Sequence, residues 1–370
     1  MRTIGIDLGT TNTVAAIDGT VVQHASGLET SAILPSVVAY PPSGAVLVGA
    51  TARKRRAIDP KNTIYSAKRV IGQRWLSYSA SKYRKQYPFD MVEAVGGLCA
   101  FKTRAGIVSP VDVAARIVDK LFAGHSMLRN EVNAVVTVPA AFDTGARRAT
   151  IAAAEQAGLT RVELVDEPVA TAMAYVTMRS ERARYAAVYD LGGGTFDLAL
   201  IDCSVTPARV IRHAGDAYLG GDDIDRAIAE WVSAQVLERF GWELDNDPEV
   251  RDRLLVECEQ AKIRLTSEPR TTIQLARVDP AAPQAAEQVE VDQDTVNGLV
   301  QDHVTRTFML CDQVLREAQL SPSQIDVVYL AGGATMMPLV QQGVAHYFGA
   351  LPRVEFDPMQ VVAVGASLAG

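Results

Sequence analysis

One stretch of this chain decides how the rest of it must fold: Asp190-Leu191-Gly192-Gly193-Gly194-Thr195-Phe196-Asp197. The apolar residues 185–189 before it and the alternating residues 196–201 after it predict two strands, and the three glycines predict a tight turn with positive φ values. Backbone N–H groups that converge in such a turn can bind an anion, and the flanking Asp190, Thr195 and Asp197 could hold a hydrated divalent cation beside it. An ordinary glycine-rich hairpin with solvated acids is the alternative interpretation of this stretch alone.

A second copy of the same plan near the N-terminus favours the phosphate-binding interpretation. Residues 4–18 repeat an apolar strand, the triplet Asp7-Leu8-Gly9, a turn of small and hydroxyl-bearing residues, and an apolar strand that ends in Asp18. Two such hairpins predict a duplicated fold whose halves face each other across one phosphate group. A third motif lies at residues 325–335, where a buried-looking strand runs into Gly332-Gly333 at the head of a helix and a sugar or base can approach the backbone.

With these three motifs, the chain resembles the nucleotide-binding domain of the 70-kDa heat-shock chaperones, within the superfamily that also holds actin and the sugar kinases. Four further segments match the chaperones in order and are absent from actin and the sugar kinases: residues 65–72, 136–142, 165–172 and 214–223. The resemblance covers essentially the whole chain. It implies an α/β fold of the two-lobed, actin-like ATPase type, made of duplicated RNase H-like domains that each carry an inserted subdomain.

The resemblance also sets the expected division of the chain. We expect lobe I over residues 1–180, with an inserted subdomain at about 37–106, and lobe II over residues 181–354, with a second insertion at about 222–300. Residues 355–370 are expected to return to lobe I as a helix.

Capping and periodicity signals predict where several helices begin and end. Ser109 is followed by Pro110 and Asp112, which predicts a helix start with a hydroxyl cap, a proline at the first position and an acid three residues after the cap. Further helices are expected at residues 144–158 and at residues 167–178.

The resemblance implies which residues bind the nucleotide. Phosphate would be held by the two hairpin tips and by the segment that follows the second hairpin: Gly9, Thr10, Thr11, Asn12, Gly192, Gly193, Gly194, Thr195, Gly220 and Gly221. Adenosine would contact residues of two later segments: Glu259, Lys262, Thr266, Gly332, Gly333, Ala334 and Met336. In a helix over residues 250–265, the spacings of three, four and seven place the first three of these on one face. A charged, solvated helix face is the alternative interpretation of that spacing.

The catalytic set that the resemblance implies is Lys68, Glu167, Asp197, Thr195, Asp7 and Asp190. Asp7 and Asp190 would hold Mg²⁺ through its waters, Lys68 would reach the β- and γ-phosphates, and Glu167 with Asp197 would orient or deprotonate the attacking water. Phosphoryl transfer to water needs little else from a protein. The resemblance further implies K⁺ near Asp7 and Asp197. Without it, Lys68 would be interpreted as a snorkelling surface lysine and Glu167 as a carboxylate at a helix N-terminus.

The implied function is a slow, Mg²⁺-dependent ATPase that binds ATP and ADP. It would be the nucleotide-binding domain of an Hsp70-like chaperone of a divergent bacterial type, a nucleotide-controlled switch in protein folding and the stress response. A sugar-type kinase, which would need an acceptor-binding cleft, and an actin-like filament ATPase are the alternatives. The context of Lys68 between Ala67 and Arg69, together with Glu167-Pro168, favours the chaperone. Because no peptide-binding domain follows before Gly370, we expect either an excised domain or a stand-alone ATPase.

Composition argues against several other classes of protein. With 370 residues, 48% hydrophobic and 21% charged, the chain can bury two cores, and its net charge of -7 argues against nucleic acid as a partner. The basic run at residues 53–56 is interpreted as a solvated helix face. No signal peptide and no apolar run of ~18 residues is present, so no membrane partner is expected. Four widely separated cysteines without CxxC spacing favour a reduced cytoplasm, where we expect a monomer.

Departures from the family pattern lead to two further expectations. Met336 stands where an arginine normally stacks on adenine, and Met359 stands where an aspartate is usual, so the nucleotide should be held more loosely. The J-domain cochaperones of the family carry a basic helix that docks on an acidic strand, yet residues 207–213 are basic here and Glu163 occupies the position of a receptive arginine. Like charges lower affinity. We therefore expect that a generic J-domain does not dock, and that the true cochaperone either carries altered charges or is not a J-domain at all. Neutral drift of a surface that still docks through apolar contacts is the alternative. A nucleotide-exchange factor is a further possible partner.

Overall fold

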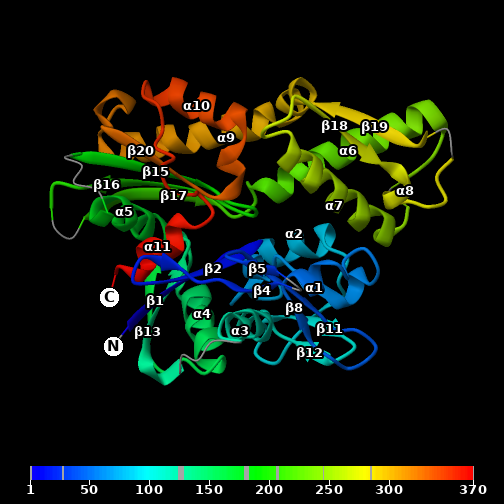
Figure 1. Ribbon diagram of the computed structural model, residues 1–370, viewed down its shortest axis with the longest axis horizontal. Helices are drawn as coiled ribbons and strands as arrows, with labels where there is room; N and C mark the ends of the chain where they lie inside the picture. The colour runs from blue at the N-terminus through cyan, green and yellow to red at the C-terminus, as the bar shows by residue number, and fades with distance from the viewer. Residues whose placement is uncertain are drawn as a thin grey trace.

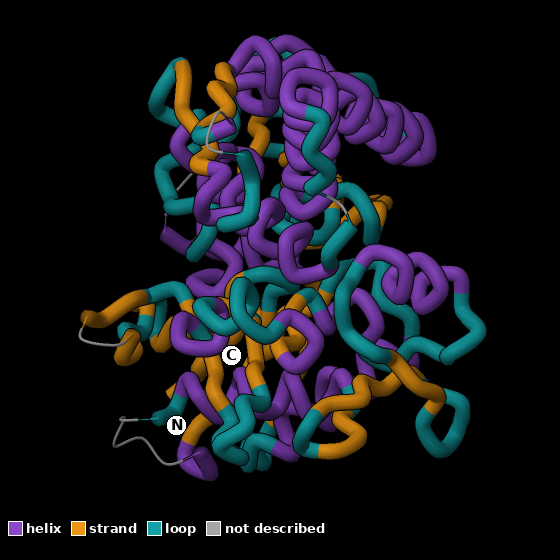
Figure 2. The backbone as a smooth tube through the Cα atoms, turned by 90° about the vertical axis from the view of Figure 1, so that its right-hand side faces the viewer, coloured by secondary structure: helices purple, strands orange, loops and turns teal. Residues whose placement is uncertain are grey.

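The computed structural model describes residues 2–26, 29–123, 129–178, 183–205, 208–244, 246–283 and 286–369. Figure 1 shows two lobes, one above the other, each built around its own sheet. In the side view of Figure 2, as in Figure 1, both ends of the chain lie in the lower lobe. We call the lower body, which holds the N-terminal strand, the first lobe and the upper body the second lobe.

The sheet of the first lobe is organised around β1 (Arg2–Leu8). Strand β1 pairs antiparallel with β2 and parallel with β13, and the alternation of this register buries Ile4 and Ile6 almost completely. From edge to edge the order is β14 (Val162–Asp166), β13 (Val132–Val138), β1, β2 (Asn12–Ile17) and β3 (Thr20–Val21), and β6 (Leu34–Pro35) also pairs with β2.

The sheet of the second lobe repeats this plan. Strand β15 (Tyr185–Leu191) pairs antiparallel with β16 (Phe196–Asp202) and parallel with β20 (Val327–Ala331), as β1 does with β2 and β13. Strand β17 (Arg209–Asp216) forms the edge beyond β16, with a register shift between Leu200 and Ile201. Both predicted hairpins are therefore present, and each places its Asp-Leu-Gly triplet at the end of a central strand.

Helices α5 (Glu167–Met178) and α11 (Val361–Ser367) lie between the two sheets (Figure 1). Helix α5 contacts strands of both sheets, and α11 packs against α5, β1 and β2. Their contact leaves no room for side chains, because a Cβ on Gly365 would lie 2.5 Å from the carbonyl carbon of Ala170. The α5–α11 pair thus joins the two lobes at their base.

Helices α3 (Pro110–Leu121) and α4 (Thr144–Gln156) cover the other face of the first sheet. The predicted start of α3 is confirmed: Ser109 accepts a hydrogen bond from the backbone N–H of Asp112, and Asp112 accepts one from the N–H of Ser109. The predicted limits of α4 and α5 also agree with the structure to within two residues.

A small subdomain extends from the first lobe toward the cleft. It consists of β7 (Val37–Ala39), β8 (Leu47–Val48), α1 (Ala50–Arg53), β9 (Thr63–Tyr65), α2 (Tyr78–Gln86), β10 (Met91–Glu93), β11 (Cys99–Thr103), β12 (Gly106–Val108) and the 3₁₀ turns Pro60–Asn62 and Ala67–Val70. The strands β4 (His24–Ser26) and β5 (Glu29–Ser31), which precede it in sequence, form a separate two-stranded sheet. Its core is aromatic, since Tyr83 and Phe101 are fully buried and the Tyr83 ring stacks on Tyr87 with centroids 4.0 Å apart.

The second lobe carries the remaining elements: α6 (Gly221–Phe240), α7 (Pro248–Arg264), β18 (Arg270–Gln274), α8 (Leu275–Val278), β19 (Gln288–Asp292), α9 (Gln293–Ala318), α10 (Pro338–Phe348) and the 3₁₀ turns Pro322–Gln324 and Gly333–Met336. Helix α9 packs on β16 and β17, and α6 packs on α7 and α9. A further 3₁₀ turn, Arg129–Glu131, precedes β13 in the first lobe.

Three local predictions are wrong. Gly192, Gly193 and Gly194 do not have positive φ values. Gly332-Gly333 leads into a 3₁₀ turn, and the helix begins only at Pro338. Helix α7 ends at Arg264, before Thr266.

The predicted lobe and insertion limits stay predictions. The limit between residues 180 and 181 lies outside the described residues, and so does Pro207, the first residue of the segment 207–213. None of the helices in the described part of the chain is long and apolar enough to cross a membrane.

Candidate functional site

A pocket lies where the tips of the two hairpins meet. It is lined by these predicted residues: Asp7, Gly9, Thr10, Thr11, Asn12, Lys68, Glu167, Asp190, Gly192, Gly193, Gly194, Thr195, Gly332 and Gly333. Pro358, Met359 and Val362, which are not among the predicted site residues, complete the lining. Residues from positions 7 to 362 thus form one site, which we call the phosphate pocket.

The glycines of the second hairpin are needed for close contact with the first hairpin. A Cβ on Gly193 would lie 2.7 Å from the Cβ of Thr11, and one on Gly194 would lie 2.9 Å from Nε of Arg69. Gly192 is less constrained, because its nearest neighbour would be the carbonyl oxygen of Thr195 at 3.6 Å. The glycine run therefore lets the tips of the two hairpins pack closely, which is a different reason from the positive φ values that the sequence suggested.

Gly220 and Gly221 support the phosphate pocket without lining it. The N–H of Gly221 donates to the carbonyl oxygen of Gly192 over 2.9 Å, and the N–H of Asp222 donates to that of Gly193 over 2.6 Å. These bonds tie the glycine loop to the start of α6. Gly220 and Gly221 thus help to hold the glycine loop in position, although they do not line the pocket themselves.

Lys68 and Glu167 meet at the centre of the phosphate pocket. Lys68 comes from the 3₁₀ turn Ala67–Val70 of the small subdomain and Glu167 from the first residue of α5. Lys68 Nζ donates to Glu167 Oε1 over 2.6 Å, and both side chains are nearly buried. Burial lowers the pKa of Lys68, but the charges of Glu167 and Asp7 outweigh it and raise that pKa, so the ammonium stays charged.

The aspartates of the two triplets stand close to this ion pair. Burial, followed by the charge of Glu167, raises the pKa of Asp7 to about 7, and the same two causes, with the charge of Asp7, raise the pKa of Asp190 well above its ordinary value. A cation between them would relieve this repulsion, so the donor set fits the hydrated Mg²⁺ that the resemblance implies. Among the described residues, no three His, Cys, Asp or Glu side chains are grouped to ligate a metal directly.

The buried hydroxyl of Thr11 also fits a bound ligand. Its oxygen has no hydrogen-bond partner within the described residues, although it lines the phosphate pocket. A buried polar atom without a partner costs about 1–3 kcal/mol, which a phosphate oxygen in the pocket would offset.

Asp197 does not reach the phosphate pocket. It is buried and lines a second cavity behind the pocket, with Thr10, Lys68 and Thr195 shared between the two. A Cβ on Gly215 would lie 2.9 Å from Cγ of Asp197, so β17 holds this carboxylate in its rearward position. Burial, followed by the charges of Glu167 and Asp190, raises the pKa of Asp197 well above its ordinary value.

The residues predicted to contact adenosine are divided among different places. Glu259 accepts from Arg53 over 2.6 Å, and Lys262 pairs with Asp225 over 2.8 Å. Thr266 lies beyond the end of α7 and donates to the carbonyl oxygen of Ile263, so the prediction that it shares a helix face with the other two is wrong. Ala334 and Met336 belong to the 3₁₀ turn after Gly332 and do not line the phosphate pocket.

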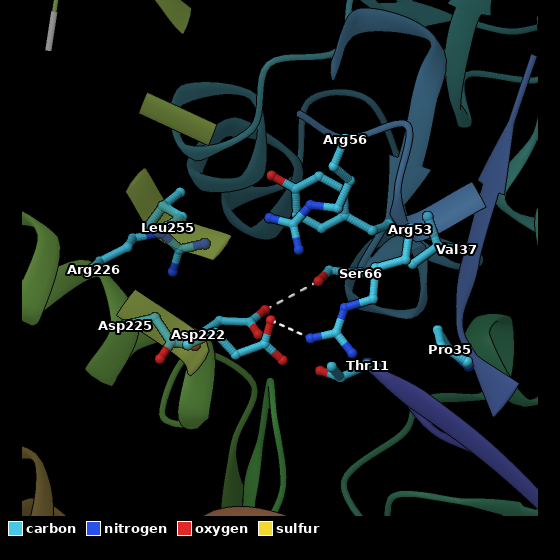
Figure 3. A pocket seen from close by; sticks show the side chains of 12 residues that line it. Thr11, Pro35, Val37, Arg53, Arg56, Ser66, Asp222, Asp225, Arg226 and Leu255 are labelled. Atoms are coloured by element: carbon cyan, nitrogen blue, oxygen red, sulfur yellow. Dashed lines mark hydrogen bonds and ion pairs between the residues drawn. The ribbon is translucent and has the colours of Figure 1, made fainter. Parts of the chain in front are cut away.

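A cleft between the small subdomain and the second lobe adjoins the phosphate pocket at Thr11, which lines both (Figure 3). The figure shows Arg53, Arg56 and Ser66 on one wall and Asp222 and Arg226 on the other. Ser66 donates to Asp222 over 3.0 Å across this cleft.

A buried ion pair closes the same cleft. Arg56 donates to both oxygens of Asp252, over 3.0 and 3.3 Å, and the hydroxyl of Tyr65 donates to Asp252 over 2.6 Å. Arg56 is only 9% exposed, so the interpretation of residues 53–56 as a solvated helix face is wrong at this position. No local signal in the sequence distinguishes Arg56 from its solvated neighbours.

Comparison with known families agrees with this geometry. The family described as Hsp70 protein has a sequence model that matches residues 3–370. The resemblance drawn from the motifs is therefore confirmed, and with it the two-lobed actin-like ATPase fold.

Proposed function

Because this chain belongs to the Hsp70 family, we propose that it is a Mg²⁺-dependent ATPase that acts as a nucleotide-controlled conformational switch. It is an Hsp70-type ATP-binding chaperone domain, and members of the family are ATPases that bind ATP or ADP with Mg²⁺. The observation that carries the proposal is the buried Lys68–Glu167 pair at the meeting point of two phosphate-binding hairpins.

The side chains of the phosphate pocket can each take a part in hydrolysis. Asp7 and Asp190 would hold Mg²⁺ through its waters, and the metal would supply positive charge that neutralises the phosphates. Lys68 would stabilise negative charge on the transferred group, and its bond to Glu167 keeps that carboxylate oriented. Glu167 would orient the attacking water and accept its proton. The hydroxyl of Thr195 would hold the γ-phosphate.

Contacts across the cleft support the switch. Arg53–Glu259 and Arg56–Asp252 join the small subdomain to α7 of the second lobe. Both pairs must separate if the lobes open to admit or release nucleotide, so nucleotide binding and lobe closure would stabilise each other. We propose that this coupling controls a polypeptide-binding partner.

The direct test is ATP hydrolysis by the purified chain with Mg²⁺ and with a chelator in its place. We expect slow turnover that requires the metal. Bound nucleotide without hydrolysis under either condition would contradict the ATPase. Phosphoryl transfer to a sugar, or nucleotide-dependent pelleting, would instead favour the kinase or the filament protein of the same superfamily.

Several expectations from the sequence belong to the same proposal. We propose that the chain works in the cytoplasm as a monomer, in the stress response, with K⁺ bound near Asp7 and Asp197 and with a nucleotide-exchange factor as partner. Nucleotide turnover compared in K⁺ and Na⁺ buffers checks the ion, and the mass in solution checks the monomer.

Nucleotide affinity should rise in the Met336→Arg protein. Met336 ends the 3₁₀ turn after Gly332 and is 43% exposed, so an arginine there has room to stack on a base. A cation–π stack contributes about 0.5–2 kcal/mol, or about 2- to 30-fold in affinity, of which the methionine already recovers a part. Calorimetry with ADP measures the gain. Met309→Arg is the matched control, because Met309 is an exposed methionine on α9, away from the turn that holds Met336. Equal affinity of both variants would contradict this account.

A generic J-domain should leave the ATPase rate unchanged. Arg209 and Arg212 are exposed on the edge strand β17, and Glu163 is exposed on the edge strand β14. Steady-state hydrolysis with a J-domain should rise only in the triple variant Glu163→Arg, Arg209→Glu, Arg212→Glu, and that rise should fall with salt. Arg270→Glu, at the exposed first residue of strand β18, is the control. Strong stimulation of the unmodified chain would eliminate the charge-reversal account.

A further inference from the structure

The cavity behind the phosphate pocket has a volume of about 190 Å³. A water molecule occupies about 30 Å³ of liquid, so the cavity has room for a small polar ligand with several waters. Thr10, Lys68 and Thr195 line both this rear cavity and the phosphate pocket, so the two spaces adjoin at the place proposed for the γ-phosphate.

Arg69 gives the rear cavity an unusual donor. Its side chain is fully buried, and one terminal nitrogen pairs with Asp223 over 3.2 Å and with Asp222 over 3.5 Å. The other two nitrogens, Nε and Nη1, are buried and have no hydrogen-bond partner within the described residues. Nε lies beside Gly194 of the glycine loop. Two unsatisfied buried N–H donors next to a phosphate loop are what an oxyanion would satisfy.

Three acids line the rear cavity, Asp143, Asp197 and Asp216, and two of them have partners in the structure. Asp216 forms an ion pair with Arg306, and Asp143 accepts a hydrogen bond from the N–H of Ala146 at the start of α4. For Asp197, burial and the charges of Glu167 and Asp190 outweigh the charge of Lys68 and raise its pKa, which favours the neutral carboxyl. Nζ of Lys82 lies over the ring of Tyr218, 4.1 Å from the ring centroid. Lys82 is also attracted by the charge of Asp216. The basic groups Lys68, Arg69, Lys82 and Arg306 thus lie along this side of the molecule.

The rear cavity reaches the surface between two loops, one from each lobe. Ala141 and Asp143 lie in the loop between β13 and α4, and Ala217 lies in the loop between β17 and α6. All three residues are exposed, whereas Arg69 and Asp197 deeper in the cavity are buried. Small alanine side chains therefore stand at the mouth on both sides.

We propose that the rear cavity is a binding site for inorganic phosphate and the route by which it leaves while ADP still occupies the front of the site. The proposal rests on the proposed ATPase. Phosphate cleaved beside Lys68 and Thr195 lies next to the unsatisfied donors of Arg69, and the mouth between Ala141 and Ala217 leads from there to solvent. Arg69 positions the phosphate, and the two loops set how fast it exchanges.

The probe is inorganic phosphate added to the ADP-bound protein. Calorimetry gives its affinity, and mixing the loaded protein with an excess of a fluorescent phosphate sensor in a stopped-flow instrument gives its dissociation rate. In Ala141→Phe and Ala217→Phe, we expect phosphate to leave about 10-fold more slowly or slower still, with little change in affinity. Ala45→Phe, an exposed alanine in the loop between β7 and β8, should exchange phosphate at the original rate.

Arg69→Gln tests the site itself. It should weaken phosphate binding by about 10- to 100-fold, because charge-assisted hydrogen bonds are lost. If this variant does not fold, as judged by its thermal unfolding, the Ala141→Phe and Ala217→Phe proteins provide the test by themselves. Failure to bind ADP would count against the proposed ATPase. If ADP binds normally but phosphate does not bind, the proposed rear site is wrong. It is also wrong if phosphate exchanges at the original rate in both Ala141→Phe and Ala217→Phe.

Discussion

Single-turnover ATP hydrolysis should fall by about 10²- to 10⁴-fold when Glu167 is replaced by alanine, because a positioned general base contributes that much. Lys68→Ala should lower the rate by about 10²- to 10³-fold, the usual effect of removing one group that stabilises developing charge. Thr195→Ala should also lower the hydrolysis rate. Nucleotide should remain bound in all three, since the glycine loop and the backbone of both hairpins are unchanged.

The Lys68–Glu167 pair needs variants that separate chemistry from folding. Removing one partner leaves the other buried without compensation, which costs about 3–5 kcal/mol of stability. Glu167→Gln keeps the shape and an oxygen that can accept from Lys68, so it should fold well and still lose most of the rate. Its thermal unfolding and its quenched-flow hydrolysis rate are the two readouts.

A matched control removes an ion pair of the same length elsewhere in the first lobe. Arg129 pairs with Asp119 over 2.6 Å, outside the phosphate pocket. Arg129→Ala should hydrolyse ATP at the original rate. Retention of that rate by Lys68→Ala, Thr195→Ala and Glu167→Ala alike, with nucleotide bound, would refute the proposed mechanism.

Nucleotide binding should be nearly lost in the Gly193→Ala protein. The new methyl group would lie 2.7 Å from the Cβ of Thr11, a distance that no rotation of the threonine relieves, so the two hairpin tips must separate. Overpacking of this kind costs about 1–3 kcal/mol, and displacement of the loop from the phosphate adds the loss of its N–H donors. Together these predict a decrease of about 10³-fold or more in ADP affinity, measured by calorimetry.

Gly192→Ala is the control, one residue away in the same loop. Its methyl group would meet the carbonyl oxygen of Thr195 at 3.6 Å and the Thr195 hydroxyl at 3.9 Å, both ordinary contact distances. Because Gly192 does not have a positive φ, alanine fits its backbone as well. We expect ADP affinity close to that of the unmodified chain. Equal affinities of the two alanine variants would show that contact between the hairpins does not shape the phosphate pocket.

Much of the fold and of the site could be predicted from local sequence. The duplicated Asp-Leu-Gly triplets predicted both hairpins, and the capping residues Ser109 and Asp112 predicted the start of α3. Strand period, turn chemistry and helix caps act over a few residues, so a single sequence carries them directly. The assignment of Lys68 and Glu167 needed the family resemblance, because 99 positions separate them and neither has a local signature.

The tertiary structure alone decided how distant residues face one another. Asp197 points to the rear cavity because β17 packs against it, and Glu259 and Lys262 are engaged by partners on other segments. Arg56 is buried against Asp252, 196 positions away, although its neighbours in sequence resemble a solvated basic run. Such contacts depend on how two lobes and a small subdomain pack, and packing sums weak interactions from many segments. The pattern of residues therefore determined which elements form and where a phosphate is expected to bind, whereas the approach of the lobes decided which charges pair and which cavities lie between them.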